Sequence, residues 1–413
     1  MTEGIFLRIL EKMEYKTIED LGDLNGKTVM LRADLNVPVD ENLKVTNTAR
    51  IDRTVPTIRK LMSKGAKVVI VSHFGRPEGF GDVKNSLKNI VEDMQKALGK
   101  KVVFVEDCIG EKVASAIKAM KNDEVLLLEN LRYYKEESKG DEEFAKKLVA
   151  PVDVYVSDAF STAHRAHASM VAAPSQKPSA MGLLMAEEVY ALTKGLNNPV
   201  RPMMAIVGGS KVSTKLDLLN NLVKKVDKLV ISGGMVHTFL KAQGFDTINE
   251  NNSLLQSDMV DTAKTIMQTA KEHNCEIIFP IDLVVAKEFA ANSENKSVDL
   301  EHIPAEGHLL DVGHKSAELI CQKLEECKTV IWNGPLGAFE LKPFDRGTNI
   351  VAEKVAKLTE AGKIISVAGG GDTVSALENA GVADKFTYIS TAGGAFLEWM
   401  EGKELPGVAI FKK

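Results

Sequence analysis

Basic side chains recur in the first half of the sequence, directly after runs that read as β-strands. They are His73 and Arg76 after the run 67–71, Arg132 after 124–128, and His164, Arg165 and His167 after 152–156. The carboxyl ends of parallel strands meet at one edge of a sheet, so we expect these side chains to lie close together. One arginine alone would more simply form a surface salt bridge, but guanidinium groups in number bind phosphate and carboxylate oxygens. The recurrence predicts a site for a small substrate with at least two negative charges.

Two further features bear on this site. Arg50 lies just before a predicted helix and can join the other arginines. The spacing of His164 and His167 would also suit a metal ion, but no third ligand of a suitable type follows nearby. Hydrogen bonding around a bound anion is the preferred interpretation of the two histidines.

Glycine follows the predicted strands in the second half of the sequence. The turns contain Gly208-Gly209, Gly233-Gly234, Gly334 with Gly337, Gly369-Gly370-Gly371, and Gly393-Gly394. A glycine turn that opens a helix presents free N–H groups to a phosphate, and the helix dipole favours its charge. A single turn of this kind needs no ligand, because tight turns require glycine anyway. Five at one sheet edge favour a nucleotide site.

The elements that must position these loops alternate between strand and helix. The predicted strands are 28–31, 67–71, 102–105, 124–128 and 152–156, then 204–207, 228–231, 276–279, 329–332, 364–367 and 386–389. Helical spacing of apolar residues marks the intervening segments, for example 51–64 and 257–272. This alternation predicts an α/β protein with two Rossmann-like domains, each a parallel sheet covered by helices, joined by a hinge helix.

The boundary between the two domains is placed at one helical stripe. It consists of Met185, Val189, Leu192 and Leu196, and the pattern stops at Asn197-Asn198-Pro199. This helix either joins two domains or closes the first one. The predicted division is residues 1–184 for the anion-binding domain, 185–200 for the interdomain helix and 201–398 for the nucleotide-binding domain.

Composition excludes several classes of protein. A formal net charge of −5 over 413 residues argues against a dedicated nucleic-acid binder, and 44% hydrophobic residues argue against disorder. The cysteines are too few and too scattered for a disulfide framework or a zinc site: Cys108, Cys275, Cys321 and Cys327. No apolar run of about 18 residues is present, so no membrane span is expected. Residues 1–12 lack the features of a signal or transit peptide, so a short extension and a cytoplasmic location are expected.

Familiar nucleotide fingerprints are absent from the sequence. No G-x-G-x-x-G motif follows a predicted strand, which weakens the alternative of an NAD-dependent two-domain oxidoreductase. The segment Gly22–Thr28 approaches a Walker A loop, but it is one residue short and precedes a strand, so it is interpreted as a turn. A non-catalytic, two-lobed solute-binding protein is the second alternative, which the absence of an export signal opposes.

From about Lys27 to Val408 the chain resembles the phosphoglycerate kinase family. The resemblance rests on Arg-Ala-Asp-Leu-Asn-Val-Pro at 32–38, His-Phe-Gly-Arg-Pro at 73–77, Asp-Ala-Phe-Ser-Thr-Ala-His-Arg-Ala-His at 158–167, Gly-Gly-Ser-Lys-Val at 208–212, Trp-Asn-Gly-Pro at 332–335 and Gly-Gly-Gly-Asp-Thr at 369–373. These motifs stand in the family's order. Four residues depart from its usual pattern, none at an expected catalytic position: Phe74, Ser232, His314 and Ala392.

The resemblance implies phosphoryl transfer between 1,3-bisphosphoglycerate and ADP, which gives 3-phosphoglycerate and ATP. The residues implied for phosphoglycerate binding are Asp34, Asn36, Arg50, His73, Phe74, Gly75, Arg76, Arg132 and Arg165. Those implied for the nucleotide are Lys211, Lys215, Glu340, Gly369, Gly370, Gly371, Asp372, Thr373, Gly393 and Gly394. Asp372 would hold Mg²⁺ and Glu340 the ribose hydroxyls. Arg50 and Lys211 would be the catalytic groups.

This reaction explains why the sequence offers no obvious catalytic dyad. The nucleophile is a carboxylate or phosphate oxygen that is already charged, so positioning and charge neutralisation remain as the tasks of the protein. Anion sites on two domains must be brought together, so hinge closure is expected. The resemblance further implies a monomer whose C-terminal tail, 399–413, packs back on the first domain. Neither a nucleic acid nor a membrane is expected as a partner.

Overall fold

A computed structural model describes residues 13–121 and 123–413, so the predicted extension 1–12 lies outside the described residues. The chain divides into two compact units. Unit 1 runs to Tyr190 and also contains Glu404–Lys413, and unit 2 is Ala191–Lys403. The boundaries predicted at 184 and 200, and the role of the segment between them as a hinge, stay predictions. No helix in the described part of the chain is long and apolar enough to cross a membrane.

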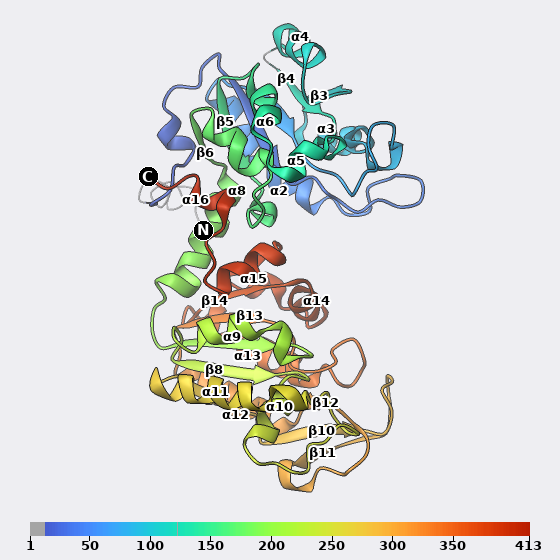
Figure 1. The fold of residues 1–413 in the computed structure, drawn as a ribbon, viewed down its shortest axis with the longest axis vertical. Coiled ribbons are helices and arrows are strands. Elements are labelled where there is room, and N and C mark those ends of the chain that lie inside the picture. The colour runs from blue at the N-terminus through green and yellow to red at the C-terminus, as the bar shows by residue number, and fades with distance from the viewer. Residues whose placement is uncertain (1–12, 122) are drawn as a thin grey trace. The chain divides into compact units, whose positions relative to one another are not determined.

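Unit 1 is built on a six-stranded parallel sheet (Figure 1). Its strands are β1 (Thr28–Ala33), β2 (Lys67–Val71), β3 (Lys101–Val105), β4 (Glu124–Leu128), β5 (Val154–Asp158) and β6 (Ser179–Met181), in the order β3-β4-β2-β1-β5-β6. The sequence placed β5 two residues too early, because the N–H of Val152 still bonds back to Val149 at the end of the preceding helix. The short strand β6 was not predicted.

Helices cover both faces of this sheet. They are α2 (Ala49–Ser63), α3 (Val91–Leu98), α4 (Glu111–Ala119), α5 (Lys135–Lys139), α6 (Glu142–Val149), α7 (Ala173–Ser175) and α8 (Leu183–Leu192). Alternate residues of β1 enter different cores: Val29 and Leu31 pack with apolar residues of α2 and α3, whereas Met30 packs with those of α4 and α6. Every residue of β1 is buried, and successive side chains point to opposite faces of the sheet. The sheet is therefore packed between two layers of helices.

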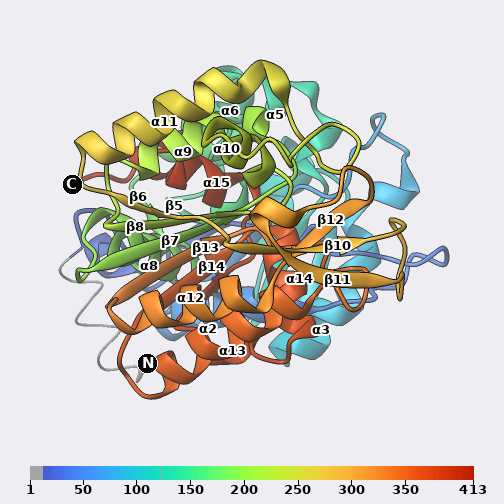
Figure 2. The same cartoon turned by 90° about the horizontal axis from the view of Figure 1, so that it is seen from below.

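Unit 2 repeats this architecture around a second six-stranded parallel sheet. Its strands are β7 (Met203–Gly208), β8 (Lys228–Ser232), β9 (Glu276–Ile278), β13 (Thr329–Asn333), β14 (Ile365–Gly369) and β15 (Tyr388–Ser390), in the order β15-β14-β13-β7-β8-β9. Its helices are α9 (Leu216–Leu222), α10 (Val236–Ala242), α11 (Val260–Glu272), α12 (His314–Glu325), α13 (Arg346–Glu360), α14 (Gly371–Asn379) and α15 (Gly394–Met400). Figure 2 shows α9, α10 and α11 on one face of the sheet, and α12 and α13 on the other. The prediction of two α/β domains with parallel sheets is confirmed.

Unit 2 also contains a small antiparallel sheet that the sequence analysis missed. Strands β10 (Asp282–Ala286), β11 (Asn295–Asp299) and β12 (His308–Val312) pair in the order β11-β10-β12 (Figure 2). Most side chains of β11 are polar and exposed, so the strand lacks the apolar run that marked the others. The three strands also follow one another without a long helix between them, which breaks the β-α alternation used to find strands.

The C-terminal segment Glu404–Lys413 completes unit 1. It contains the short helix α16 (Pro406–Ala409), and the N–H of Gly407 donates to the carbonyl of Ala163 at 2.9 Å. The carbonyl of Phe411 accepts from Lys16 at 2.7 Å, and the Phe411 side chain is fully buried, at 0% exposure. The chain end is therefore part of the core of unit 1.

We predict that Phe411→Ala destabilises unit 1 by about 3–5 kcal/mol, because the substitution empties a fully buried aromatic site. The neighbouring Lys412 is exposed and serves as the control, with Lys412→Ala expected to change stability by less than about 0.5 kcal/mol. Urea denaturation followed by fluorescence and circular dichroism measures both. Equal stability of the two variants would show that the tail adds nothing to the core.

Candidate functional site

Basic side chains of unit 1 stand at or after the carboxyl ends of four neighbouring strands, with Arg32 on β1 itself. β4, β2, β1 and β5 are adjacent and parallel, so the loops after them emerge at one edge. We call the residues gathered there the basic rim, which comprises Arg32, His73, Arg76, Arg132, His164, Arg165 and His167. Burial, Arg132, Arg32 and Arg165 together lower the pKa of His167 to about 4. The adjacent strand ends bring these basic side chains to one edge of the sheet, where Nη2 of Arg32 lies 3.2 Å from Nδ1 of His73.

Arg50 lies in the first turn of α2 and pairs with Asp34, which follows β1. Its Nη1 atom is 2.8 Å from Oδ1 and 2.7 Å from Oδ2 of Asp34, and the hydroxyl of Ser161 donates to the same carboxylate. Burial raises the pKa of Asp34, but the Arg50 guanidinium and the hydrogen bond from Ser161 oppose burial, and the net shift is downward. The charged carboxylate thus holds Arg50 at this edge, with the guanidinium still partly exposed.

Asn36 and Arg132 are joined through the backbone of Gly75. Oδ1 of Asn36 accepts from the Gly75 N–H at 2.8 Å, and Nη1 of Arg132 donates to the Gly75 carbonyl at 2.8 Å. Gly75 has a φ of +57°, and a Cβ there would lie 1.7 Å from Oδ1 of Asn85. Another residue here would be strained by this φ and would displace the Asn85 side chain. Gly75 thus links the loops after β1, β2 and β4.

His73 is held as a neutral imidazole by Arg32. Nη2 of Arg32 lies 3.2 Å from Nδ1 of His73, and a guanidinium can only donate, so Nδ1 accepts and the ring proton is assigned to Nε2. Burial and the charge of Arg32 place the pKa of His73 well below its ordinary value. Arg32 itself is fully buried, at 0% exposure. The sequence analysis quoted Arg32 in a motif but assigned it no role.

The remaining predicted residues of unit 1 differ in exposure. Arg76 and Arg165 are exposed, and Nε of Arg165 is 3.3 Å from Nε2 of His164. Phe74 is buried instead, with its N–H and carbonyl both bonded to the side chain of Asn130 at 3.1 and 2.6 Å. Phe74 therefore shapes the loop and does not open onto solvent.

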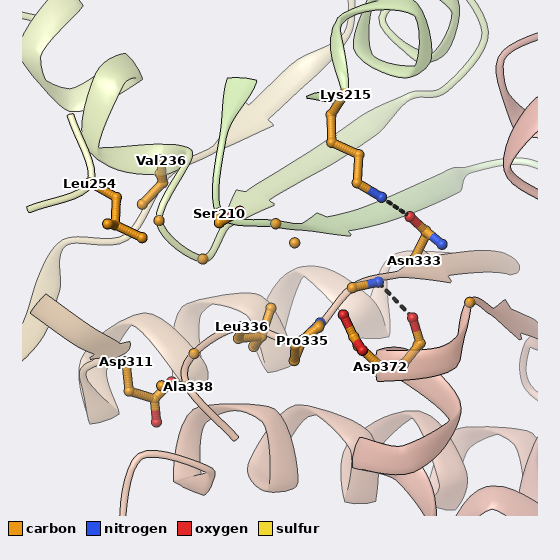
Figure 3. A pocket seen from close by; sticks show the side chains of 18 of the residues that line it. Ser210, Lys215, Val236, Leu254, Asp311, Asn333, Pro335, Leu336, Ala338 and Asp372 are labelled. Atoms are coloured by element: carbon orange, nitrogen blue, oxygen red, sulfur yellow. Dashed lines mark hydrogen bonds between the residues drawn. The ribbon is translucent and has the colours of Figure 1, made fainter. Parts of the chain in front are cut away.

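Unit 2 carries a cavity of about 530 Å³ at the carboxyl edge of its main sheet (Figure 3). Of the residues predicted for a nucleotide, the following line it: Lys215, Glu340, Gly370, Gly371, Asp372, Thr373, Gly393 and Gly394. Gly369 and Lys211 do not line the cavity. Lys211 is exposed and precedes the short 3-10 turn Val212–Thr214.

Glycine brings the ends of β7 and β13 unusually close. A Cβ on Gly208 would lie 1.9 Å from the carbonyl oxygen of Pro335, and one on Gly334 would lie 2.2 Å from that of Gly208. Gly334 also has a φ of +98°, which other residues rarely adopt. The two loops can line one cavity only because both positions lack a side chain.

A hydrogen-bonded chain crosses the floor of the cavity. Nζ of Lys215 donates to Oδ1 of Asn333, whose Nδ2 donates to the Gly369 carbonyl at 2.9 Å. The N–H of Gly334 donates to Oγ1 of Thr373 at 2.7 Å. Figure 3 shows the bond between Lys215 and Asn333 across the two loops. Burial lowers the pKa of Lys215, while Glu401 and Asp372 act in the opposite direction.

Helix α14 begins at the cavity and presents unpaired backbone donors. Its first hydrogen bond runs from the N–H of Val374 to the carbonyl of Gly370, at 2.9 Å. The N–H groups of Gly371, Asp372 and Thr373 precede that bond, and the helix dipole adds positive potential there. Such a helix start is suited to a phosphate group.

The carboxylate of Asp372 stands beside these donors and is exposed. Mg²⁺ prefers oxygen ligands and is commonly held by one or two carboxylates together with nucleotide phosphates. Within residues 13–121 and 123–413, no group of three or more His, Cys, Asp or Glu side chains is arranged to hold a metal ion by itself. The donor set therefore fits a Mg²⁺ that arrives with a nucleotide.

The comparisons with known proteins decide the family. The sequence profile described as phosphoglycerate kinase matches residues 18–403. The phosphoglycerate kinase of Methylorubrum extorquens (strain PA1) is 55% identical over 399 residues, covering 97% of this chain and 99% of its own, and that of Rhizobium meliloti is 54% identical over 401 residues, covering 97% and 100%. The chain belongs to the phosphoglycerate kinase family.

Solved structures of phosphoglycerate kinases are also similar to this chain. The enzyme from Coxiella burnetii has a TM-score of 0.88 at 38% identity, and that from Pyrococcus horikoshii has 0.78 at 31% identity. Each comparison covers 96% of this chain and 98% of the other. The chain is accordingly a phosphotransferase, and these similarities do not favour the oxidoreductase alternative.

Several residues around the cavity escaped the sequence analysis. Its apolar wall includes Leu254, Leu283, Phe289 and Leu309. Leu254 and Phe289 are 54% and 65% exposed, and a lone exposed apolar residue gives no signal in a sequence. Asp311 also lines the cavity, where it accepts the N–H of Gly347 at 2.8 Å, and burial raises its pKa to about 8. No motif pointed to Asp311.

We predict that Gly208→Ala destabilises unit 2 by at least about 1–3 kcal/mol, because a methyl group at 1.9 Å from a backbone oxygen forces the two loops apart. Gly371→Ala is the control, since a Cβ there meets no atom within 4 Å. Thermal unfolding of both variants gives the comparison. A Gly208→Ala protein as stable as the control would mean that the loops yield without cost.

Proposed function

We propose that the protein catalyses reversible, Mg²⁺-dependent phosphoryl transfer from 1,3-bisphosphoglycerate to ADP, giving 3-phosphoglycerate and ATP. The observation that carries the proposal is the match to the phosphoglycerate kinase family over residues 18–403. The geometry of each unit supports it independently. Unit 1 gathers arginines at one sheet edge, and unit 2 has a glycine-lined cavity at its own.

The basic rim is suited to phosphoglycerate because that substrate carries a phosphate and a carboxyl group. Exposed guanidinium groups at Arg76 and Arg165 reach solvent, while Arg132 is fixed by the Gly75 carbonyl. Guanidinium pairs bind both kinds of oxyanion in two-point geometry. We assign Asp34 and Asn36 the roles of holding Arg50 and the Gly75 loop, and His73 that of an N–H donor that stays neutral.

The cavity of unit 2 is the proposed nucleotide site. The N–H groups at the start of α14 and the Lys215 ammonium would bind phosphate, and Glu340 on the cavity wall would bind ribose hydroxyls. Asp372 would hold Mg²⁺, which supplies charge neutralisation at the phosphates when it is bound. The apolar residues Leu254 and Phe289 offer surface for a base.

Proton transfer has no place in this reaction. The attacking oxygen, on a carboxylate or a terminal phosphate, is already ionised near pH 7, so a general base has no task. The neutral state of His73 and the paired state of Asp34 accord with this, since neither is arranged to exchange a proton. The work left to the protein is to align donor and acceptor and to neutralise charge on the transferred group.

We assign the catalytic roles to Arg50 and Lys211, one in each unit. Both would stabilise the phosphoryl group during in-line transfer. They can act together only if the units close on each other, and residues 185–200 are the proposed hinge. Closure would also exclude water that would otherwise hydrolyse the acyl phosphate.

The cellular setting follows from the family. Phosphoglycerate kinase is an enzyme of glycolysis, a cytoplasmic process, and we place this protein there. We propose that it acts as a monomer on small molecules alone, because each proposed site is complete within one unit of a single chain.

A coupled assay tests the proposal directly. The protein is supplied with 3-phosphoglycerate, ATP and Mg²⁺, and the product is reduced by glyceraldehyde-3-phosphate dehydrogenase with NADH. NADH oxidation should require all three components and should stop when EDTA removes the metal. No turnover of 3-phosphoglycerate by folded protein would refute the proposed reaction, and undiminished turnover in EDTA would refute its dependence on Mg²⁺.

We predict that Arg50→Ala and Lys211→Ala each lower kcat by roughly a hundredfold or more, as expected for loss of one donor to the transition state. Arg59→Ala on the same helix α2 and Lys224→Ala in unit 2 are the matched controls, since both residues are exposed. Steady-state kinetics measures all four variants. If kcat of both test variants stays within about tenfold of wild type, neither residue has the catalytic role.

We predict that Asp372→Ala weakens binding of Mg²⁺–ADP and leaves binding of 3-phosphoglycerate unchanged. The substitution removes an oxygen ligand at the start of α14 without touching unit 1. Glu378→Ala, an exposed carboxylate later on the same helix, is the control. Isothermal titration calorimetry with each ligand alone gives the result, and a parallel loss of both affinities would point to general damage.

A further inference from the structure

In helix α5 a glutamate is the buried residue and the other side chains are exposed. Its sequence is Lys-Glu-Glu-Ser-Lys, and of its five residues Glu137 alone is buried, at 0% exposure. An amphipathic helix normally buries apolar residues, and an ionised carboxylate is costly to bury unless it is paired. The burial of Glu137 therefore needs a partner of opposite charge.

The partner of Glu137 is Arg32, and Ser169 connects the two side chains by hydrogen bonds. Oε1 of Glu137 accepts from Oγ of Ser169 at 2.6 Å, and Oε2 accepts from the Ser169 N–H at 2.9 Å. Oγ of Ser169 in turn accepts from Nε of Arg32 at 3.1 Å. Ser169 lies in a π-helical turn, Ala168–Ala172, a conformation that often occurs at functional sites. A fully buried carboxylate and a fully buried guanidinium are thus bridged by one hydroxyl.

The close approach of α5 to the basic rim depends on Gly140. This residue ends α5 with a φ of +70°, and a Cβ there would lie 2.5 Å from the carbonyl of Ala166. The end of α5 therefore packs directly on the loop that carries Arg165 and His167. Nδ1 of His167 lies 3.9 Å from Oε1 of Glu137.

The charge of Glu137 acts on the rim as a whole. Burial, Arg32 and Arg165 lower the pKa of Arg132, whereas Glu137 raises it. A second acid near the rim, Asp34, is already engaged by Arg50 and Ser161. Glu137 is therefore placed to offset the repulsion between Arg32 and Arg132.

We propose that Glu137 is an internal counter-anion that sets how tightly the basic rim binds its anionic substrate. Glu137 stabilises the empty rim and holds Arg32 in position, and it competes with the substrate for the same positive potential. The inference rests on the proposed function insofar as that substrate is phosphoglycerate. Glu137 is a positioning and affinity-determining residue, and it does not touch the substrate itself.

The substitution Glu137→Gln separates charge from hydrogen bonding. A glutamine oxygen can accept the Ser169 N–H, and its amide can donate to Ser169 Oγ, which can still accept from Arg32. The Ser169 hydroxyl then loses the acceptor that Oε1 of Glu137 provides for its proton. The bridge from residue 137 through Ser169 to Arg32 is kept, and one negative charge is lost. We expect the Kd and KM for 3-phosphoglycerate to fall on the order of tenfold, with the KM for ATP unchanged. Glu136→Gln, the exposed neighbour on α5, is the control and should change neither value.

The substitution Ser169→Ala separates position from charge. Both charges remain, but Arg32 loses its Nε acceptor and its hold on Nδ1 of His73 weakens. We expect the Kd for 3-phosphoglycerate to rise roughly tenfold, and ¹⁵N NMR of His73 should show loss of the Nε2–H tautomer. A purely structural role for this network would weaken binding in both variants, whereas the proposal requires opposite signs.

Thermal unfolding with inorganic sulfate provides a readout that does not depend on the reaction. Without anions Glu137→Gln should unfold at a lower temperature than wild type, and sulfate should raise its Tm by more than it raises that of wild type. A variant that folds only with sulfate present would also support the proposal. An unchanged or raised Kd for 3-phosphoglycerate in folded Glu137→Gln, or no extra stabilisation by sulfate, would overturn it. Wild-type protein that binds sulfate but no 3-phosphoglycerate would instead refute the proposed substrate.

Discussion

The structure of unit 1 depends on keeping several guanidinium groups together at the end of one parallel sheet. Like charges at such distances repel, and a fully buried group such as Arg32 cannot rely on water to screen it. The surrounding structure supplies the compensation: Asp34 pairs with Arg50, Glu137 faces Arg32 through Ser169, and His73 stays neutral. The burial of Glu137, on a helix whose other residues are exposed, accords with this need.

The proposed anion site of unit 2 relies on backbone groups in place of side-chain charges. Its cavity is lined mainly by glycine loops and by the free N–H groups of α14, and Lys215 is the lysine among the lining residues. Backbone dipoles need no counter-charge such as the Glu137 carboxylate, which faces Arg32 through Ser169 in unit 1. The site instead constrains the sequence at Gly208 and Gly334, because a side chain at either position would force the two loops apart. Fixed charges suit a small, highly charged acid, and backbone donors suit phosphates that arrive with a metal.

The placement of residues at strand ends could be predicted from sequence, because the carboxyl ends of parallel strands all lie at one edge of the sheet. Arg132 and Gly371 were placed in this way, and the structure has both at the predicted sheet edges. Glu137 could not be found, since it lies in a short polar helix whose local pattern is that of a solvent-exposed turn. The antiparallel sheet escaped for a related reason, because β11 is stabilised by pairing with β10 and not by burial of its own side chains. The periodicity of apolar residues in a sequence indicates which surface is buried. It gives no signal where an element is stabilised by strand pairing or by a buried charge.

The central claim is that each unit holds one of the two substrates, the acid at the rim of unit 1 and the nucleotide at the glycine edge of unit 2. Chemical-shift mapping by amide and arginine-side-chain NMR, with each ligand added alone, tests it most directly. 3-Phosphoglycerate should shift Gly75, Arg132 and Arg165 and leave Gly370 and Gly371 unchanged, and Mg²⁺–ADP should do the reverse. Shifts of Gly370 and Gly371 by 3-phosphoglycerate, with the signals of Arg132 and Arg165 unmoved, would contradict the assignment of the two sites.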